Sequence, residues 1–210
     1  MEIIQEDEAS ALEWQRRAVA VQATDSRATG EERAIQLESL AQLELNAGEG
    51  SRAEQLYVRI AELRAEEDEA DAMAQTMASG AEAAYGAGEF DTAERLALRA
   101  LNAHPQADEE LAARKVLADV SWAAVNRGTD DLEILLAAAG EDEEVLRARD
   151  RLRSLVVLED NSNLESLARL VQVEALRGQP LGAARWQQVL LEESDGGTPK
   201  MRLDLATLFA

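Results

Sequence analysis

The chain has 210 residues, of which 46% are hydrophobic and only 3% aromatic, and its formal net charge is −21 at pH 7. This hydrophobic content is enough for a buried core and differs from that of disordered chains. The negative charge disfavours binding to nucleic acids and to anionic membrane surfaces, and the absence of cysteine excludes disulfides and thiolate metal sites.

Alanine and leucine dominate the apolar residues, and β-branched residues are sparse, which favours helices over strands. The first ten residues, MEIIQEDEAS, lack the basic and apolar regions of a signal peptide. No apolar run approaches the ~20 residues that a transmembrane helix needs. We therefore expect an all-α, cytoplasmic protein with no membrane insertion.

Glycine recurs after helix-like segments at intervals of 40, 40 and 50 residues, at Gly48, Gly88, Gly128 and Gly178. Glycine just past a helix end adopts the left-handed conformation at little cost, because it lacks a Cβ atom. Small or apolar residues stand eleven, eight, seven and three residues before each glycine, which is the spacing of one helix face. The sequence therefore predicts a helix, a tight turn and a second helix, four times over.

In chain order, the pattern predicts a cap helix over 6–23, four helix pairs and a closing helix over 200–209. The first helices of the pairs span 31–47, 70–87, 108–127 and 163–177, and the second helices span 51–65, 91–103, 130–139 and 181–193. An additional helix over 141–160 occupies the wider last interval. Because such pairs cannot bury their apolar faces alone, we expect an α-solenoid of 10–11 helices in a single domain, 1–210, with repeat units near 31–65, 70–105, 108–140 and 163–193.

Residues after the turns suggest how the second helices begin. Ser51 with Glu54, and Asp91 with Glu94, have the spacing of capping boxes. In the third unit the matching pair is Asp130 with Glu133, two residues past Gly128, so we expect this helix to start one residue earlier. Glu133 then falls where the other units have an apolar residue, and the nearby leucines, Leu132, Leu135 and Leu136, take over the core positions.

A stretch over 74–107 resembles the tetratricopeptide repeat (TPR) family through Tyr85, Gly88, Phe90, Ala93, Ala97, Ala100 and Pro105. The first unit is a looser match, through Gly48, Ala53, Tyr57 and Ile60. The 40-residue interval exceeds the family's usual length of about 34, which implies longer helices. The resemblance implies a protein-interaction scaffold that binds a peptide or a partner helix on the concave surface formed by the first helix of each pair.

Carried over to this sequence, the resemblance places a set of partner-binding side chains on that surface: Glu38, Gln42, Asn46, Gln75, Glu82, Lys115, Trp122, Asn126 and Gln172. Small or acidic neighbours would accompany them, at Ala78, Ala118, Glu165 and Ala168. Some family members bind a partner's C-terminal carboxylate with paired bases, whereas Lys115 is a lone base here. A basic or amide-rich partner matches the acidic groove better.

Individual residues leave alternatives open. Trp122 is either an aromatic anchor in the groove or a packing residue between units, whereas Trp14 and Trp186 occupy expected core positions. His104, the only histidine, precedes Pro105 at an expected helix end, where a capping role is simpler than a catalytic one.

No phosphate-binding, dinucleotide-binding, zinc-protease or serine-hydrolase motif occurs in the sequence, so we expect no cofactor, no metal and no enzyme activity. Three hypotheses follow. The first is a non-catalytic adaptor that binds a partner protein, and self-association is compatible with it. The second is a structural subunit of a larger complex, held through its near-neutral C-terminal quarter and its apolar residues Trp186, Leu205, Leu208 and Phe209. The third is a helical enzyme that uses acidic residues.

Overall fold

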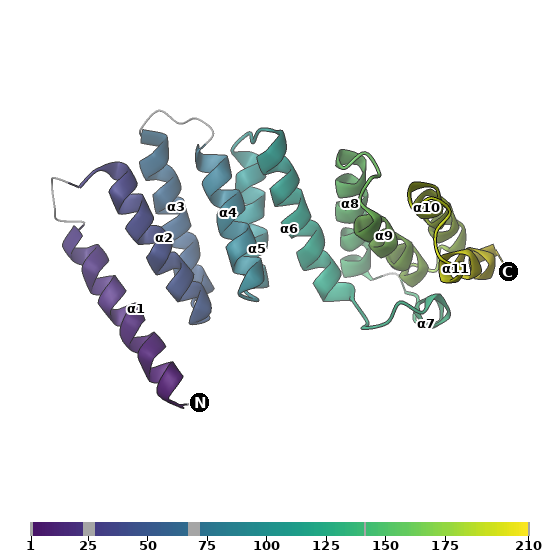
Figure 1. The fold of residues 1–210 in the computed structure, drawn as a ribbon, viewed down its shortest axis with the longest axis horizontal. Coiled ribbons are helices and arrows are strands. Elements are labelled where there is room, and N and C mark those ends of the chain that lie inside the picture. The colour runs from purple at the N-terminus through teal and green to yellow at the C-terminus, as the bar shows by residue number, and fades with distance from the viewer. Residues whose placement is uncertain (1, 23–27, 67–71, 141, 210) are drawn as a thin grey trace. The chain divides into compact units, whose positions relative to one another are not determined.

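The computed structural model describes residues 2–22, 28–66, 72–140 and 142–209 (Figure 1). These residues form eleven α-helices and no β-strand, which confirms the predicted all-α class. The helices are α1 (Glu2–Gln22), α2 (Gly30–Asn46), α3 (Gly50–Glu66), α4 (Ala72–Gly86), α5 (Phe90–Asn102), α6 (Ala107–Val125), α7 (Leu132–Ala137), α8 (Glu143–Leu158), α9 (Leu164–Leu176), α10 (Pro180–Glu193) and α11 (Pro199–Phe209).

Every predicted helix is present, although the predicted ends at residues 23, 70 and 141 lie outside the described residues. The largest difference within the pairs is α7, which is shorter than the predicted 130–139. It begins after Asp131, whose carboxylate accepts a hydrogen bond from the Glu133 backbone N–H at 3.0 Å. This side chain caps the helix one residue later than the expected Asp130.

The chain packs as two compact units, unit 1 (Met1–Val116) and unit 2 (Leu117–Ala210). In unit 1, α1 packs on α2, α2 on α3, α3 on α4 and α4 on α5 (Figure 1). Helix α2 also contacts α4, and α3 contacts α5. In unit 2, α8 to α11 pack in sequence order, and the short α7 lies against α9 and α11. Within the units, tight turns join α2 to α3, α4 to α5 and α9 to α10.

The four periodic glycines all have a left-handed backbone, with φ of +75°, +82°, +70° and +66° in chain order. After Gly48, the Glu49 N–H donates to the Glu44 carbonyl at 2.8 Å, which closes the helix end. Equivalent bonds close α4, from Glu89 to Ala84, and α9, from Gln179 to Glu174. This Schellman arrangement satisfies carbonyls that would otherwise lack partners, and the next helix starts two residues after the glycine.

The turn at Gly128 is built differently. Helix α6 ends at Val125, and the Gly128 N–H donates to the side-chain oxygen of Asn126 at 2.9 Å. Asn126 is thus part of the turn that leads from α6 to α7.

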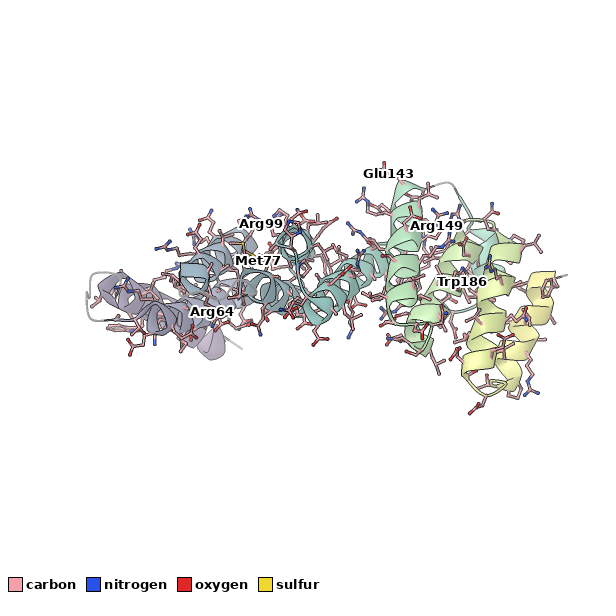
Figure 2. All side chains as sticks on the ribbon, turned by 90° about the horizontal axis from the view of Figure 1, so that it is seen from above. Arg64, Met77, Arg99, Glu143, Arg149 and Trp186 are labelled. Carbon is pink, nitrogen blue, oxygen red and sulfur yellow. The ribbon has the colours of Figure 1, made fainter. Side chains whose placement is uncertain are left out.

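The predicted periodic face is the buried face of the first helices. The positions eight residues before the glycines are all buried, at Leu40, Gly80, Val120 and Leu170. In the third unit Glu133 is exposed while Leu132 and Leu135 are buried, as expected, and Leu136 is half-buried. Met77 lies in the interior of unit 1, whereas Arg99 lies at its surface (Figure 2).

The two predicted capping boxes after the turns are wrong. Helices α3 and α5 begin at Gly50 and Phe90, so Ser51 and Asp91 lie inside the first turn instead of before it. The reason is that the glycine turn delivers the chain directly into the next helix. A capping box is instead present at the start of α2: the Glu32 N–H donates to Thr29 Oγ1 at 3.1 Å, and the Thr29 N–H donates to Glu32 Oε2 at 2.8 Å.

The prediction that Trp14 belongs to the core is also wrong, because 68% of this residue is exposed. Helix α1 packs on α2 through another face, where the Arg16 guanidinium donates to both carboxylate oxygens of buried Glu44, at 2.6 and 2.7 Å. Trp14 lies outside this contact with α2, and the Arg17 guanidinium lies 5.4 Å from the centroid of its ring. Trp186, the other tryptophan expected in the core, is half-buried.

Candidate functional site

The nine predicted partner-binding residues are divided between the two units. Unit 1 holds Glu38, Gln42, Asn46, Gln75, Glu82 and Lys115, and unit 2 holds Trp122, Asn126 and Gln172. On α2 and α4, Gln42, Asn46, Gln75 and Glu82 are exposed, and the Gln42 amide donates to Asn46 Oδ1 at 3.2 Å. Of the nine, Gln172 is the one that lines a recess described below.

Glu38 has a partner within its own unit. Arg64, at the end of α3 (Figure 2), donates to both carboxylate oxygens of Glu38 on α2 at 3.2–3.3 Å. It also donates to Glu31, which is on α2 as well. It also donates to the hydroxyl of buried Thr76 on α4 at 3.3 Å. Arg64 thus connects α2, α3 and α4, and its positive charge balances the negative charge of Glu38.

Trp122 is half-buried and packs inside unit 2. The Arg169 guanidinium lies 5.9 Å from the centroid of its ring, within the range of a cation–π contact. Arg169 in turn pairs with Asp119 and with Glu165. The ring therefore belongs to a network between α6 and α9, while Lys115 on α6 and Asn126 in the turn after it are exposed.

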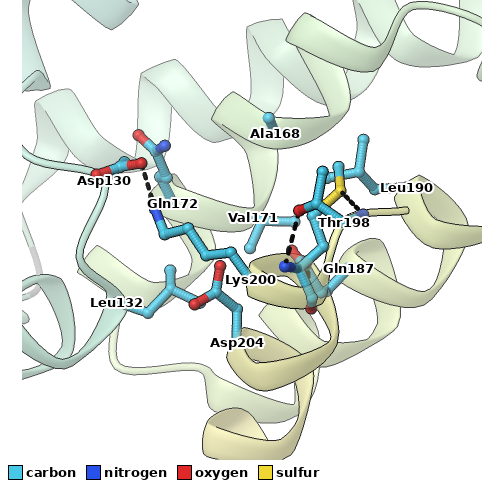
Figure 3. Close-up of a pocket in the computed structure, with 11 residues that line it drawn as sticks. Asp130, Leu132, Ala168, Val171, Gln172, Gln187, Leu190, Thr198, Lys200 and Asp204 are labelled. Carbon is cyan, nitrogen blue, oxygen red and sulfur yellow. Dashed lines mark hydrogen bonds and ion pairs between the residues drawn. The ribbon is translucent and has the colours of Figure 1, made fainter. Parts of the chain in front are cut away.

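A recess of about 230 Å³ lies in unit 2 among α7, α9, α10 and α11 (Figure 3). Aliphatic side chains form one part of its wall: Leu132, Ala168, Val171 and Leu190. The polar part consists of Asp130, Gln172, Gln187, Thr198, Lys200 and Asp204, and Met201 completes the lining. We call this site the acidic recess.

Two hydrogen bonds fix α11 beside the recess. Gln187 is buried on α10, and its amide donates to the Met201 carbonyl at 2.9 Å. Thr198, just before α11, accepts from the Met201 N–H at 3.3 Å and so caps the helix. Lys200 and Asp204 lie four positions apart and therefore share one face of α11.

In the acidic recess, the negatively charged residues Asp130 and Asp204 outnumber the positively charged Lys200. Lys200 donates to Asp130 in an ion pair (Figure 3). This hydrogen bond and the Lys200 charge lower the pKa of Asp130, and the same bond raises the pKa of Lys200, with further contributions from Asp204 and Asp131. Burial raises the pKa of Asp204; the Lys200 charge acts against this shift, and the neighbouring Asp130 and Asp131 add to it. Lys200 is thus surrounded by more carboxylates than it can neutralise.

A second recess of about 370 Å³ adjoins the first and shares four of its lining residues, Asp130, Leu132, Lys200 and Asp204. Its other lining residues are Asp131, Glu133, Leu203 and Thr207. Among the described residues that line the two recesses, four are acidic and Lys200 is the one base. The Lys200–Asp130 pair belongs to both linings and therefore stands at their junction.

Sequence reasoning identified Gln172 but missed Asp130, Lys200 and Asp204 as site residues. Asp130 and Lys200 are 70 positions apart, and no periodicity connects them. One available signal was compositional: Lys200 is one of only two lysines in a chain whose other 19 bases are arginines.

Other chemistry has no arranged site in the part of the chain that the structure describes. No group of three or more His, Cys, Asp or Glu side chains there is placed to hold a metal ion. None of the helices described is both long enough and apolar enough to cross a membrane. His104 is exposed at the end of α5, where its backbone is left-handed with a φ of +55°.

No protein-family model matches the chain, and no match was found among curated proteins. The geometry of the acidic recess is therefore the basis for assigning a function.

Proposed function

We propose that the protein is a non-catalytic adaptor that binds a polypeptide segment containing a basic residue next to apolar ones. The observation that carries this proposal is the acidic recess together with the second recess that adjoins it, where aliphatic walls meet four carboxylates and one ammonium group. Apolar walls favour an apolar side chain, and the excess of negative charge favours a cationic neighbour and disfavours acidic segments.

The architecture of unit 1 is in keeping with this proposal. Its helices follow each other in antiparallel pairs, with contacts between α2 and α4 and between α3 and α5. This is the contact pattern expected of a TPR-like array, in which the first helices face the partner. The exposed amides Gln42, Asn46 and Gln75 and the acid Glu82 are then candidate contacts for a further part of the same partner.

Binding of a model peptide tests the proposal. The probe is a capped, fluorescently labelled peptide with one arginine between two leucines, followed by fluorescence anisotropy. We expect saturable binding that weakens by about tenfold or more between roughly 50 and 500 mM salt, because the exposed carboxylates are screened. Asp204→Asn, which removes a recess charge and keeps the side-chain volume, should weaken binding by about three- to tenfold.

Two matched controls make this result specific. A peptide with citrulline in place of arginine keeps the shape of the residue without its charge and should bind more weakly at low salt. Asp108→Asn removes one acid from α6 in unit 1, far from the lining residues in the chain, and should leave the affinity within about twofold. Equal binding of both peptides, or equal effects of both substitutions, would contradict recognition by the recess.

A second function, a structural subunit of a larger complex, is favoured by exposed apolar residues at the end of unit 2. Leu203 is 67% exposed and Phe209 is 64% exposed, both on α11, whereas Leu208 is buried within the unit and Leu205 and Trp186 are half-buried. Leu203 and Phe209 thus offer large apolar side chains at the surface of α11 that a partner subunit could cover.

The double substitution Leu203→Ser and Phe209→Ser tests this second function. In extracts of the native source, the tagged wild-type protein should migrate within a large complex on a native gel, and the variant should migrate as free protein. Melting of the purified variant, followed by circular dichroism, should match that of the wild type, because both side chains are exposed. A wild-type protein that migrates alone would rule out a permanent subunit.

A further inference from the structure

We infer that Lys200 is an internal competitor for the acidic recess, and that a partner's arginine binds there by replacing the Lys200 ammonium group at Asp130. This inference rests on the proposed function, since it names the side chain that the recess recognises and the residue that regulates its entry.

The position of Lys200 is the first argument. Its side chain and that of Asp130 line both recesses, so the ion pair stands where the two cavities meet. If the Lys200 side chain turns away, the two recesses open into each other and Asp130 loses its partner. The vacated place is bordered by Asp130 and Asp204, with the aliphatic Leu132 beside them.

The exposure of the pair is the second argument. The Lys200 side chain is 56% exposed and that of Asp130 is 72% exposed. Water screens an ion pair of this kind, and such pairs contribute little to stability. Lysine also has a flexible four-carbon stem, so its ammonium group can move into solvent without unfolding α11. The pair is therefore easy to open.

The choice of lysine is the third argument. Arginine supplies 19 of the 21 bases of the chain, and twelve of the arginines pair with Asp or Glu in the described ion pairs, yet lysine occupies the recess. An ammonium group binds a carboxylate as a point charge, whereas a guanidinium can form two parallel hydrogen bonds to it. An incoming arginine therefore has an advantage over Lys200 for Asp130, and acidic or neutral side chains have none.

Three variants of the full chain test this inference with the arginine–leucine peptide and its citrulline control. Lys200→Gln removes the competitor, and we expect binding to become about three- to tenfold tighter. Lys200→Arg keeps the net charge but places a bidentate group at Asp130, and we expect binding about threefold weaker than wild type. Arg185→Gln, on α10 outside both linings, changes the net charge as Lys200→Gln does and should alter the affinity less than about twofold.

Opposite effects of Lys200→Gln and Lys200→Arg support an internal competitor, because charge alone predicts no change for the second variant. If the wild-type protein binds the peptide and Lys200→Gln binds it equally well or more weakly, the inference is wrong while the adaptor function stands. If neither wild type nor Lys200→Gln binds the peptide, both are wrong. Melting of each variant by circular dichroism checks that the fold is retained, which we expect for so exposed a pair.

Discussion

Gly80→Ala is expected to lower the free energy of unfolding by about 1–3 kcal/mol, although alanine is the better helix former. Gly80 lies within α4, against the ring of Tyr57 on α3. A Cβ atom at this position would lie 2.7 Å from Tyr57 Cγ and 2.8 and 3.0 Å from the two Cδ atoms. Since the ring is itself buried, it cannot turn into solvent, and the two helices must separate to accommodate the methyl group.

Gly86→Ala is the matched control. Gly86 is the last residue of the same helix, and a Cβ atom there would meet nothing within 4 Å. The substitution restricts the unfolded chain to a similar degree and should be neutral or stabilising by up to about 1 kcal/mol. Urea denaturation followed by circular dichroism gives both values, and hydrogen exchange of the α3 and α4 amides assigns the loss to unit 1.

A double-substitution cycle tests the cause. Tyr57→Leu replaces the ring by a smaller side chain, so Gly80→Ala should cost less in that background than in the wild type. A coupling free energy of about 1 kcal/mol or more between the two sites would assign the loss to this contact. Additive effects, or a Gly80→Ala variant as stable as Gly86→Ala, would show that the helices have room for the methyl group.

The glycine turns could be predicted from the sequence because their cause is local. A left-handed residue after a helix needs a glycine at one position, and the spacing of the apolar residues before it reports which helix face is buried. Gly48, Gly88 and Gly178 follow this rule in both φ and hydrogen bonding. Asp160 and Asn161, after α8, have positive φ without being glycines, and no periodic signal marks them.

The misjudged residues depend on neighbours that a sequence pattern does not specify. Trp14 has the spacing of a core residue, but α1 packs on α2 through another face, so the Trp14 side chain stays in solvent. Gly80 was identified as a position on the buried face, yet its small size matters only because Tyr57 crosses it from another helix. Asp130 and Lys200 meet because α11 returns to α7, which no local signal encodes.

The second large effect also comes from Tyr57, which packs between α3 and α4: a loss of stability in alkaline solution. Tyr57 is 4% exposed, and burial, followed by the nearby charge of Glu38, raises its pKa from 10.0 to about 12. The native state therefore holds the phenol proton more tightly than the unfolded state does. The resulting stability is fully present below pH 10 and is lost as the pH rises through about 12.

A difference of one pKa unit corresponds to about 1.4 kcal/mol, so the expected loss between roughly pH 10 and pH 12 is on the order of 2–3 kcal/mol. This pH range suits the measurement because the chain has only two lysines and two tyrosines, so few other groups titrate in it. Urea denaturation at several alkaline pH values measures the loss, and near-ultraviolet absorbance reports when tyrosinate forms. Tyr57→Phe keeps the ring and removes the phenol, so its stability should change far less over this range. Parallel losses in wild type and Tyr57→Phe would mean that the Tyr57 phenol ionises in the native state as readily as in the unfolded one, and that α3 and α4 do not enclose it.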